Sequence, residues 1–487
     1  MNHLLLSRRL GLVDPHAFQR AQYQRLLYAV TPEKSVKFGI QRIPGNLNAR
    51  GLPSSSGLRE QTVDEAGLAG KNAVAHNGGV NVLAIDAQTG KYLISGGADS
   101  AVRLWDLEDY HPDEFYTYTS AGSILRSSPG AHTHALTSLS VYPFDPLPST
   151  ILTTSYDKTL KLFSVDAARI APVHTFELID TPYAHTLSSI ASSAALIAVG
   201  TAHPAVKLLD LRTGLAVQTL PGHSGAVFSV CWSPRSEHLL ASGSTDGRVL
   251  FFDVRRAHSA FASLDNDDAI GVLNPDYASN YQPRSALDWN AKAHNGPVTG
   301  VCWADSGRKL ITCGHDQRIR VWDAATGRNE LVHFGPRIKN GRNGQFMPLI
   351  SPVECSRPGK GSLFWPNDEG KGEIFMMDMN EGTTLKVLRT PGTAKSPQKT
   401  VSTGKLTSGG RINSIALRFK GDSDSGLELY SGHGDGSIHC WKGSPTEDEE
   451  VEDQIHPEVE TEQKRKRKRD LLEGLVDGLV KKPMTFI

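Results

Sequence analysis

One pattern of apolar and polar positions recurs along this chain of 487 residues. Each copy has a short apolar run, a few small residues, a turn that usually contains Asp, and a second apolar run that ends in Trp-Asp or a variant of it. A clear copy is LLASGSTDGRVLFFDVRR, residues 239–256. Apolar runs of this length joined by turn residues are typical of β-hairpins. The pattern therefore predicts a series of antiparallel strands.

Seven copies can be counted, and most follow a Gly-His or Ala-His pair and a further apolar run. The copies are residues 91–107, 150–165, 195–211, 239–256, 308–324, 361–379 and 427–443, of which 361–379 is the weakest. A repeat of this kind buries its apolar face only against neighbouring copies. We therefore expect one large repeat architecture, although the length alone also allows two or three ordinary domains.

The shared marks, which are Gly-His, Asp and Trp-Asp in that order, resemble those of the WD40 repeat family. The resemblance covers roughly residues 70–443. It implies an all-β fold, a seven-bladed WD40 β-propeller in which each blade is a four-stranded antiparallel sheet.

In that family a buried His, a strand Ser or Thr, a turn Asp and a Trp form hydrogen bonds within one blade. The resemblance implies three such structural tetrads in this chain. They are His76, Ser95, Asp99 and Trp105; His294, Thr312, Asp316 and Trp322; and His223, Ser242 and Asp246 with Phe252 in place of Trp.

The same residue types would also suit a hydrolase triad or a metal site. A trio that recurs in several repeats favours a structural role, because an enzyme needs one site. The His and Asp residues lack the short ligand spacing of a zinc site, and no helix follows the glycine turns as a phosphate loop requires. We therefore expect no catalytic, cofactor-binding or metal-binding residue, and no enzymatic activity.

Charge and cysteine content narrow the class of protein further. The chain has 52 basic and 52 acidic residues, so no overall positive field draws it to nucleic acid, and a sequence-specific nucleic-acid interaction is not expected. Its five cysteines have no metal-pair spacing and lie mostly in apolar runs, which is typical of buried thiols in a reducing compartment. Neither a signal peptide nor a membrane span is expected, so we expect an intracellular, soluble protein.

Residues 1–30 depart from the repeat pattern. A leucine-rich start precedes Asp14, which can cap a helix, and Pro15, which can begin one. The apolar residues that follow have near-helical spacing, which predicts a helix, a loop and a second helix. Two interpretations remain open at this point: the segment packs on the propeller itself, or it lies in a groove of another protein.

The remaining segments have biased composition. Residues 41–75, 257–290 and 389–410 are rich in Gly, Ser, Pro, Asn and Thr, which predicts long surface loops. Residues 447–462 hold nine acidic and no basic residues, and a terminal amphipathic helix is plausible within 470–487. The unbroken basic block between these segments fits a nuclear localisation signal, with phosphate binding or a merely solvated charge run as alternatives. Its members are Lys464, Arg465, Lys466, Arg467, Lys468 and Arg469.

A narrower resemblance rests on LSRRLGLVDPHAFQRAQ near the N-terminus, on the order of the blades, and on DVRRA in the fourth blade. Together they look like the Cockayne syndrome group A family of WD40 subunits, which acts in transcription-coupled nucleotide-excision DNA repair. The chain departs from that family in its longer loops 41–75 and 389–410 and in a divergent sixth blade.

That resemblance implies a contact with the adaptor of cullin-RING ubiquitin ligases, of the damaged-DNA-binding protein large-subunit type. In the family the N-terminal helix and loop insert into the adaptor, so the candidates here are Leu6, Arg8, Arg9, Leu12, Asp14, Pro15 and Phe18. A Trp-Asp-any-Arg box also faces the adaptor. Phe252-Asp253-Val254-Arg255 matches this box with Phe for Trp, and Leu209-Asp210-Leu211-Arg212 is a looser match.

Two roles for Arg255 remain open: it faces the adaptor, or it satisfies carbonyl groups of its own blade. For Arg256 we expect only exposure to solvent. The expected organisation is an adaptor-docking segment at 1–40, a flexible loop at 41–75, the propeller at 76–443 and a partly disordered charged tail at 444–487.

The resemblance thus implies a nuclear substrate receptor of a cullin-RING E3 ubiquitin ligase, with a Cockayne syndrome B type ATPase and RNA polymerase II as further partners. The alternative is a WD40 scaffold of another nuclear assembly, in chromatin or RNA processing. No small-molecule substrate, cofactor or membrane contact is expected.

Overall fold

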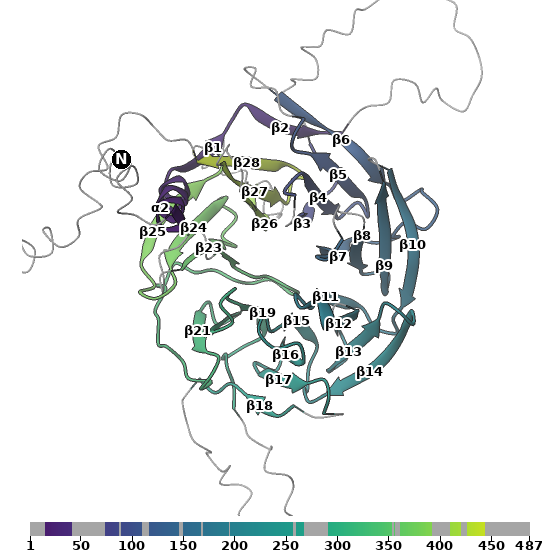
Figure 1. Cartoon of the computed structure of the whole chain (residues 1–487), viewed down its shortest axis with the longest axis vertical. Helices are drawn as coiled ribbons and strands as arrows, with labels where there is room; N and C mark the ends of the chain where they lie inside the picture. Colours follow the sequence, from purple (N-terminus) through teal and green to yellow (C-terminus); the bar gives the residue numbers. More distant parts are fainter. Residues whose placement is uncertain are drawn as a thin grey trace, which may run out of the picture. The chain divides into compact units, whose positions relative to one another are not determined.

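The computed structural model describes residues 15–40, 74–86, 89–109, 116–145, 150–166, 169–193, 195–256, 260–266, 291–352, 355, 361–391, 410–419 and 426–443. These residues form seven β-sheets arranged around a centre (Figure 1). Nearly all of the regular structure is strand. The expected seven-bladed β-propeller is confirmed.

The first three blades contain four or five strands each. Blade 1 consists of β2 (Val36–Gly39), β3 (Val80–Ile85), β4 (Tyr92–Gly97), β5 (Val102–Asp106) and β6 (Tyr116–Ile124). Blade 2 consists of β7 (Leu136–Val141), β8 (Thr150–Ser155), β9 (Thr159–Asp166) and β10 (Arg169–Glu177). Blade 3 consists of β11 (Pro182–Leu187), β12 (Leu196–Thr201), β13 (Ala205–Asp210) and β14 (Leu215–Pro221), with a short 3-10 helix, η2 (Ala191–Ser193), between β11 and β12.

The other four blades follow in chain order. Blade 4 consists of β15 (Val227–Trp232), β16 (Leu239–Ser244), β17 (Val249–Asp253) and β18 (Ala262–Ser263), and blade 5 of β19 (Val298–Trp303), β20 (Lys309–Gly314) and β21 (Ile319–Asp323). Blade 6 consists of β22 (Leu349–Ile350), β23 (Ser362–Pro366), β24 (Glu373–Asp378) and β25 (Thr384–Arg389). Blade 7 consists of β26 (Ile412–Phe419), β27 (Leu427–His433), β28 (Ile438–Gly443) and β1 (Val30–Glu33).

The repeated sequence pattern corresponds to the second and third strands of each blade. These strands are buried on both faces, since blades pack against each other through their sheet faces; β12, for example, has five consecutive buried residues. The apolar clusters accordingly combine residues of adjacent blades, such as Ala198 and Leu208 of blade 3 with Val230 and Leu240 of blade 4. The core of the molecule therefore lies between the blades.

Of the helix, loop and helix expected within residues 1–30, the second helix is present as α2 (Pro15–Tyr28), while the first helix and the loop lie outside the described residues. The strands β1 and β2 follow α2. Strand β1 pairs antiparallel with β28, and β2 pairs parallel with β6. Among the described residues after 409, blade 7 has three strands of its own, and the N-terminal strand supplies the fourth. The propeller thus includes residues well before its expected start at residue 76.

Blades 5 and 6 are irregular where they meet. Blade 5 has three strands among the described residues. In the place of a fourth strand there is an isolated bridge between Trp322 and Asn329. The chain then runs along the innermost strand β19, where the Phe346 amide donates to the Thr299 carbonyl at 2.9 Å. The divergent sixth repeat still forms a blade because its apolar residues are buried, including Trp365 at 0% exposure.

The described helices include none long and apolar enough to cross a membrane.

Candidate protein-interaction site

The polar residues expected to form tetrads lie together within single blades. In blade 1 the His76 ring lies between the turn and the second strand, with Nδ1 at 2.9 Å from Asp99 Oδ1 and Nε2 at 2.7 Å from Ser95 Oγ. The Trp105 indole donates to the same Ser95 hydroxyl at 2.9 Å. The set links the loop before the blade, the hairpin turn and two strands.

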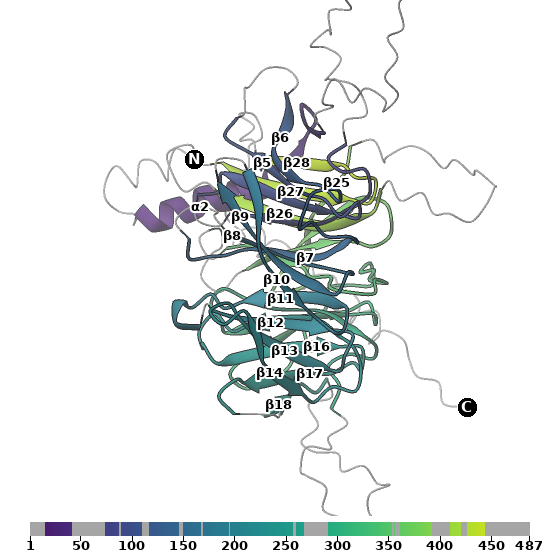
Figure 2. The same ribbon diagram turned by 90° about the vertical axis from the view of Figure 1, so that its right-hand side faces the viewer.

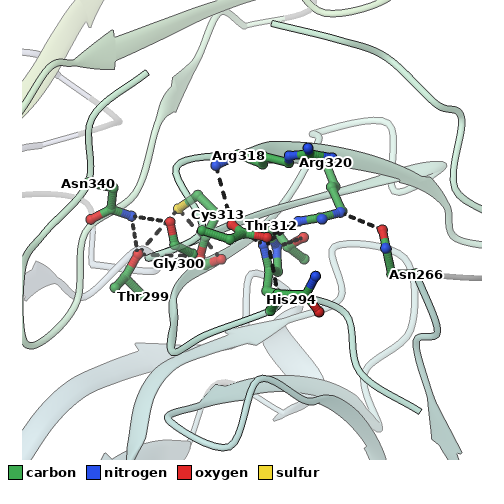
Figure 3. Close-up of polar contacts among 12 residues, drawn as sticks. Asn266, His294, Thr299, Gly300, Thr312, Cys313, Arg318, Arg320 and Asn340 are labelled. Atoms are coloured by element: carbon green, nitrogen blue, oxygen red, sulfur yellow. Dashed lines mark hydrogen bonds and ion pairs between the residues drawn. The ribbon is translucent and has the colours of Figure 1, made fainter. Parts of the chain in front are cut away.

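Blade 5 holds the second complete tetrad, of which Figure 3 labels His294 and Thr312. His294 lies 2.9 Å from Asp316 and 2.8 Å from Thr312, and the Trp322 indole donates to Thr312 at 2.8 Å. Arg320 adds an ion pair with Asp316 at 2.6 Å. Every side chain in this group has a partner within the blade.

Blade 4 has the third set without an indole. His223 lies 3.1 Å from Asp246 and 2.7 Å from Ser242, while Phe252 is fully buried at the Trp position. Burial alone would raise the pKa of Asp246, but hydrogen bonds from His223 and from backbone amides outweigh burial and lower that pKa to about 2. The turn carboxylate is therefore an anion that the hydrogen bonds of its own blade stabilise.

Two blades contain related sets that the sequence reasoning missed. In blade 2, His132 lies 2.8 Å from Asp157 and 2.7 Å from Thr153. The Ala-His pair at residues 131–132 was the available signal. In blade 7 the His comes from the strand itself: His433 lies 2.9 Å from Ser431, whose hydroxyl also accepts the indole N–H of Trp441 at 2.9 Å.

No group of His, Cys, Asp or Glu that could hold a metal ion occurs within the described part of the chain. The imidazoles of His76 and His294 are also poor bases, since burial lowers their pKa more than their Asp partners raise it. The tetrads therefore act as internal cross-links, and interaction with other molecules falls to the exposed faces.

The two faces of the propeller are distinguished by the ends of the strands. We call top the face that carries the turns between the second and third strands of each blade, such as residues 155–158. The bottom face carries the ends of the third strands, such as Asp210 in blade 3 and Asp253 in blade 4. Val30 pairs with Gly443 at the end of β28, so the end of α2 also lies at the bottom face. Figure 2 shows α2 projecting from one side of the blades.

Arg255 is held at the bottom face by the aspartate two residues before it. Its Nε donates to Asp253 Oδ1 at 3.1 Å and its Nη2 donates to Asp253 Oδ2 at 2.9 Å. The arginine side chain is nevertheless 64% exposed. The Arg255 hydrogen bonds lower the pKa of Asp253 to about 2, so the carboxylate stays charged and keeps the guanidinium oriented.

Arg212 repeats this arrangement in the neighbouring blade. Its Nε and Nη2 donate to Asp210 Oδ1 and Oδ2 at 3.3 and 3.4 Å, and its side chain is 76% exposed. Arg256 is equally exposed but lies 3.8 Å from Asp253 through a single nitrogen. Blades 3 and 4 therefore present two oriented guanidinium groups, which we call the arginine forks, at equivalent bottom-face positions.

The N-terminal helix packs on the propeller with one of its faces. Tyr23, Leu26 and Leu27 are buried in an apolar cluster with residues of blades 6 and 7, and the Lys386 ammonium donates to the Tyr28 carbonyl at 2.7 Å. The N-terminal segment was expected either to pack on the propeller or to lie in a groove of another protein. These three side chains pack on the propeller.

Several candidate residues fall outside this description. Leu6, Arg8, Arg9, Leu12 and Asp14 precede the described residues, and the basic block from Lys464 to Arg469 follows them. Pro15 begins α2 as expected, and Phe18 lies within α2, although the description of side chains starts at residue 20.

Comparison with known proteins identifies the repeats. The family described as "WD domain, G-beta repeat" matches residues 71–106, 123–164, 214–253 and 288–323. WD repeat-containing protein ATCSA-1 of Arabidopsis thaliana is 27% identical over 442 residues, which cover 78% of this chain and 89% of that protein.

Ribosome biogenesis protein ytm1 of two Aspergillus species is similar over a shorter stretch. The protein of Aspergillus clavatus is 28% identical over 322 residues, and that of Aspergillus niger is 27% identical over 314 residues. These matches cover 59% and 57% of this chain, and the chain spans 62% and 60% of those two proteins. With its seven blades, its tetrads and the four matched segments, the chain is a WD40 repeat protein.

Proposed function

We propose that the chain is the substrate receptor of a nuclear cullin-RING E3 ubiquitin ligase that acts in transcription-coupled nucleotide-excision DNA repair. The observation that carries the proposal is that the two arginine forks lie on the same face as the N-terminal helix. An oriented, exposed guanidinium offers donors in a planar array that suits carboxylates or carbonyls across an interface. The likeness to ATCSA-1 over 89% of that protein supports the same function.

The mechanism needs no reactive side chain in this subunit. The bottom face and the N-terminal segment hold the chain on the ligase adaptor, through Arg255, Arg212 and residues 6–18. The top face presents the substrate to the ubiquitin-charged enzyme, which raises its effective concentration. A repair ATPase of the Cockayne syndrome B type and RNA polymerase II are the proposed partners, and the basic block at 464–469 directs the chain to the nucleus.

A second candidate function is a WD40 scaffold of another nuclear assembly. The similarity to ribosome biogenesis protein ytm1 of Aspergillus species favours it. That function would keep the propeller and the basic block but would not require the arginine forks to bind a ligase adaptor.

Co-purification of the adaptor with four forms of the chain tests the proposal. The forms are wild type, a deletion of residues 1–14, Arg255→Glu and Arg256→Glu. The deletion stops before α2, because Tyr23, Leu26 and Leu27 are part of the core and a longer truncation would perturb blade 7. Arg256 is a matched control, since it is the adjacent arginine, is 77% exposed and lacks the two-nitrogen contact with Asp253.

We expect wild type and Arg256→Glu to capture the adaptor, and the deletion and Arg255→Glu to lose most of it. Thermal melts must show that all four forms are folded. If folded wild-type protein captures no adaptor, the ligase proposal fails and the general nuclear scaffold becomes the better account.

A further inference from the structure

The chain between blades 5 and 6 crosses the centre of the top face. Residues 338–347, which we call the strap, lie between β21 and β22. The Phe346 amide donates to the Thr299 carbonyl of blade 5 at 2.9 Å. The Arg342 guanidinium donates to the Ile412 carbonyl of blade 7 at 2.7 Å. The strap thus joins the innermost strands β19 and β26, which lie on different sides of the ring centre (Figure 1).

The strap also reaches the innermost strands of blades 3 and 4. Gly344 lies so near β11 that a Cβ added to it would be 3.9 Å from the Tyr183 ring. The Met347 sulfur lies 3.7 Å from the Ser229 hydroxyl of β15. A segment that contacts the innermost strands of four blades covers the centre of the top face.

Alternate side chains of the strap are buried, as in an extended strand. Asn340 and Phe346 are 4% and 2% exposed, whereas the odd-numbered residues between them are half-buried or exposed. The Asn340 amide donates to the Thr299 hydroxyl at 2.7 Å, and to the Gly314 carbonyl at the top turn of blade 5 at 3.2 Å (Figure 3). Residues 339–345 include no apolar side chain. Polar contacts therefore hold this part of the strap.

Arg342 makes most of these contacts. Its Nη2 donates to the Ile412 carbonyl and to the side-chain oxygen of Asn413, and its Nη1 donates to the Asn413 carbonyl at 3.2 Å. Its Nε lies 3.5 Å from Asp368 Oδ1, and the side chain is only 12% exposed. Burial and the nearby Arg411 lower the pKa of Arg342 to about 10, so the guanidinium is still a cation at neutral pH.

The oxygens that accept from Arg342 are positioned mainly by β26. Asn413 drops out of the pairing register between Ile412 and Ser414, which is a β-bulge. Successive carbonyls of a regular strand point to opposite sides, so the bulge allows two adjacent carbonyls to reach one guanidinium. The Asn413 amide donates to the Val80 carbonyl of blade 1 at 2.7 Å, which orients its oxygen toward Arg342. Other parts of the ring therefore hold this set of acceptors in place.

Net charge does not explain the binding of a cation here. Asp368 is 10% exposed and also pairs with Arg411 at 2.9 Å, so the two charges balance without Arg342. Selectivity therefore depends on the number and arrangement of the acceptor oxygens. A planar guanidinium with five N–H groups can satisfy several oxygens at once, whereas a lysine ammonium is a point charge with three donors.

We propose that the strap is an internal ligand that occludes an arginine-binding site at the centre of the top face, and that an arginine-containing peptide segment of a partner enters this site when residues 339–345 lift. Ile338 and Phe346, which are 1% and 2% exposed, anchor the two ends. A segment with few buried apolar contacts opens at a lower cost than the blades.

This inference deepens the proposed function, because it names the chemistry of the substrate segment that the top face presents. It rests on that function only for the word substrate. The strap shows which ligand the site accepts, since its own arginine is the occupant.

Fluorescence anisotropy with a peptide copy of the strap tests the inference. The probe is a fluorescein-labelled peptide with the sequence KNGRNGQF, which is that of residues 339–346. Two comparison probes have lysine or alanine in place of the arginine. All three are measured against the full-length wild-type protein and three variants, Arg342→Ala, Arg342→Lys and Arg337→Ala.

Arg337→Ala is the matched control. Arg337 precedes the strap, its side chain is 59% exposed, and its ion pair with Glu373 is long, at 3.9 Å. Removal of this side chain leaves all contacts of Arg342 in place. Thermal melts establish which forms are folded.

We expect Arg342→Ala to bind the arginine probe about tenfold or more tightly than the lysine and alanine probes, because only a guanidinium matches all the vacated acceptors. Wild type and Arg337→Ala should bind the arginine probe at least about tenfold more weakly than Arg342→Ala does, since their site is occupied. Arg342→Lys should bind it with intermediate affinity.

Equal binding of the arginine and alanine probes to Arg342→Ala would overturn the inference, because the site would then not select a guanidinium. Wild-type binding as tight as that of Arg342→Ala would also overturn it, since the strap would not occlude the site. If Arg342→Ala does not fold, Arg342→Lys is judged by the same two criteria. Failure of both variants to fold would show that the strap is an obligatory part of the ring, which contradicts a replaceable ligand.

Adaptor capture by Arg342→Ala separates this inference from the ligase proposal. Normal capture together with no selective probe binding means that only the present inference fails. Selective probe binding together with no capture by wild type means that only the ligase proposal fails.

Discussion

Single residues hold each blade together through buried hydrogen bonds. The His76 and His294 rings each join a turn aspartate to a hydroxyl of the second strand. A net hydrogen bond contributes only about 1 kcal/mol, but a buried group that loses its partner costs roughly 1–3 kcal/mol. The blades therefore depend on the tetrads mainly because the loss of one member leaves the other buried members without a hydrogen-bond partner.

Asp316→Ala should lower the free energy of unfolding by about 2–4 kcal/mol, because it removes the partner of His294 and leaves the buried Arg320 guanidinium without its carboxylate. Asp99→Ala should cost about 1–3 kcal/mol, since no ion pair with an arginine is lost there. Urea unfolding measures both. Asp323→Ala, which changes a half-buried aspartate of blade 5 outside the tetrad, is the control and should cost less than either tetrad variant. Wild-type stability in both tetrad variants would contradict a structural role.

The buried imidazole of His185 should make stability fall in mild acid. Burial lowers the pKa of His185 to about 4, and its partners are the hydroxyls of Ser140 (2.7 Å) and Thr154 (3.3 Å). The unfolded chain binds this proton near pH 6.5, so the contribution of His185 is complete above that pH and is lost as the pH falls toward 4. The loss should be about 3 kcal/mol.

His185→Gln keeps a hydrogen-bonding side chain but cannot titrate. Its urea midpoint should therefore change less than that of wild type between pH 7 and pH 4. The change of an exposed histidine, His203→Gln, serves as the control and should leave the wild-type profile as it is. Parallel profiles for wild type and His185→Gln would show that this imidazole is not responsible.

At the scale of elements, α2 and β1 belong to the propeller as well as to the N-terminal segment. Strand β1 completes blade 7 through pairing with β28, and Leu27 of α2 is 1% exposed. An N-terminal strand that pairs with the last blade closes the ring without covalent linkage. The adaptor-docking role proposed for this region therefore falls on residues up to about 18, upstream of the buried side chains.

Leu27→Ala should lower the free energy of unfolding by about 2–5 kcal/mol, since it leaves a cavity in the cluster between α2 and blade 7. Deletion of residues 1–14 should leave the thermal midpoint close to that of wild type. Tyr28→Ala, at a neighbouring position that is 39% exposed, should have a small effect. Calorimetry of the three forms tests this order, and a deletion as unstable as Leu27→Ala would show that the first residues are also needed for the fold.

At the scale of the whole molecule, the free thiols report on opening of the ring. All five cysteines lie in blades 4 to 7, and Cys313, Cys355 and Cys440 are buried. Burial raises the pKa of Cys231 to about 11 and that of Cys313 to about 12, so little thiolate is present at neutral pH.

Iodoacetamide at pH 7.5 should therefore modify the thiols of the native protein slowly. After denaturation it should modify all five thiols together. Because the buried thiols require blades to separate, their rate of modification should follow the rate of global unfolding. Mass spectrometry of the labelled peptides measures each rate. Rapid labelling of Cys440 alone would indicate that blade 7 opens while the rest of the ring stays closed.

Much of this architecture was predictable from local sequence. The number of blades follows from the count of hairpins, and His76, Ser95 and Asp99 lie within 24 residues of one another, so their association follows from one repeat. The tetrad of blade 2 was missed although the same signal was present at Ala131-His132. The histidine of blade 7 was not predictable, because His433 occupies a strand position where blades 1 and 5 have Gly97 and Gly314.

The sequence by itself determined the hairpins, the turns and the WD40 character, because each depends on contacts between residues close in the chain. Only the tertiary structure decided that β1 pairs with β28, that Arg212 and Arg255 share a face with the end of α2, and that the rings of Tyr156 and Tyr183 lie close together at the top face. These arrangements join segments from different repeats. These contacts form when the ring closes and the blades pack. A local pattern of apolar and polar residues therefore does not predict them.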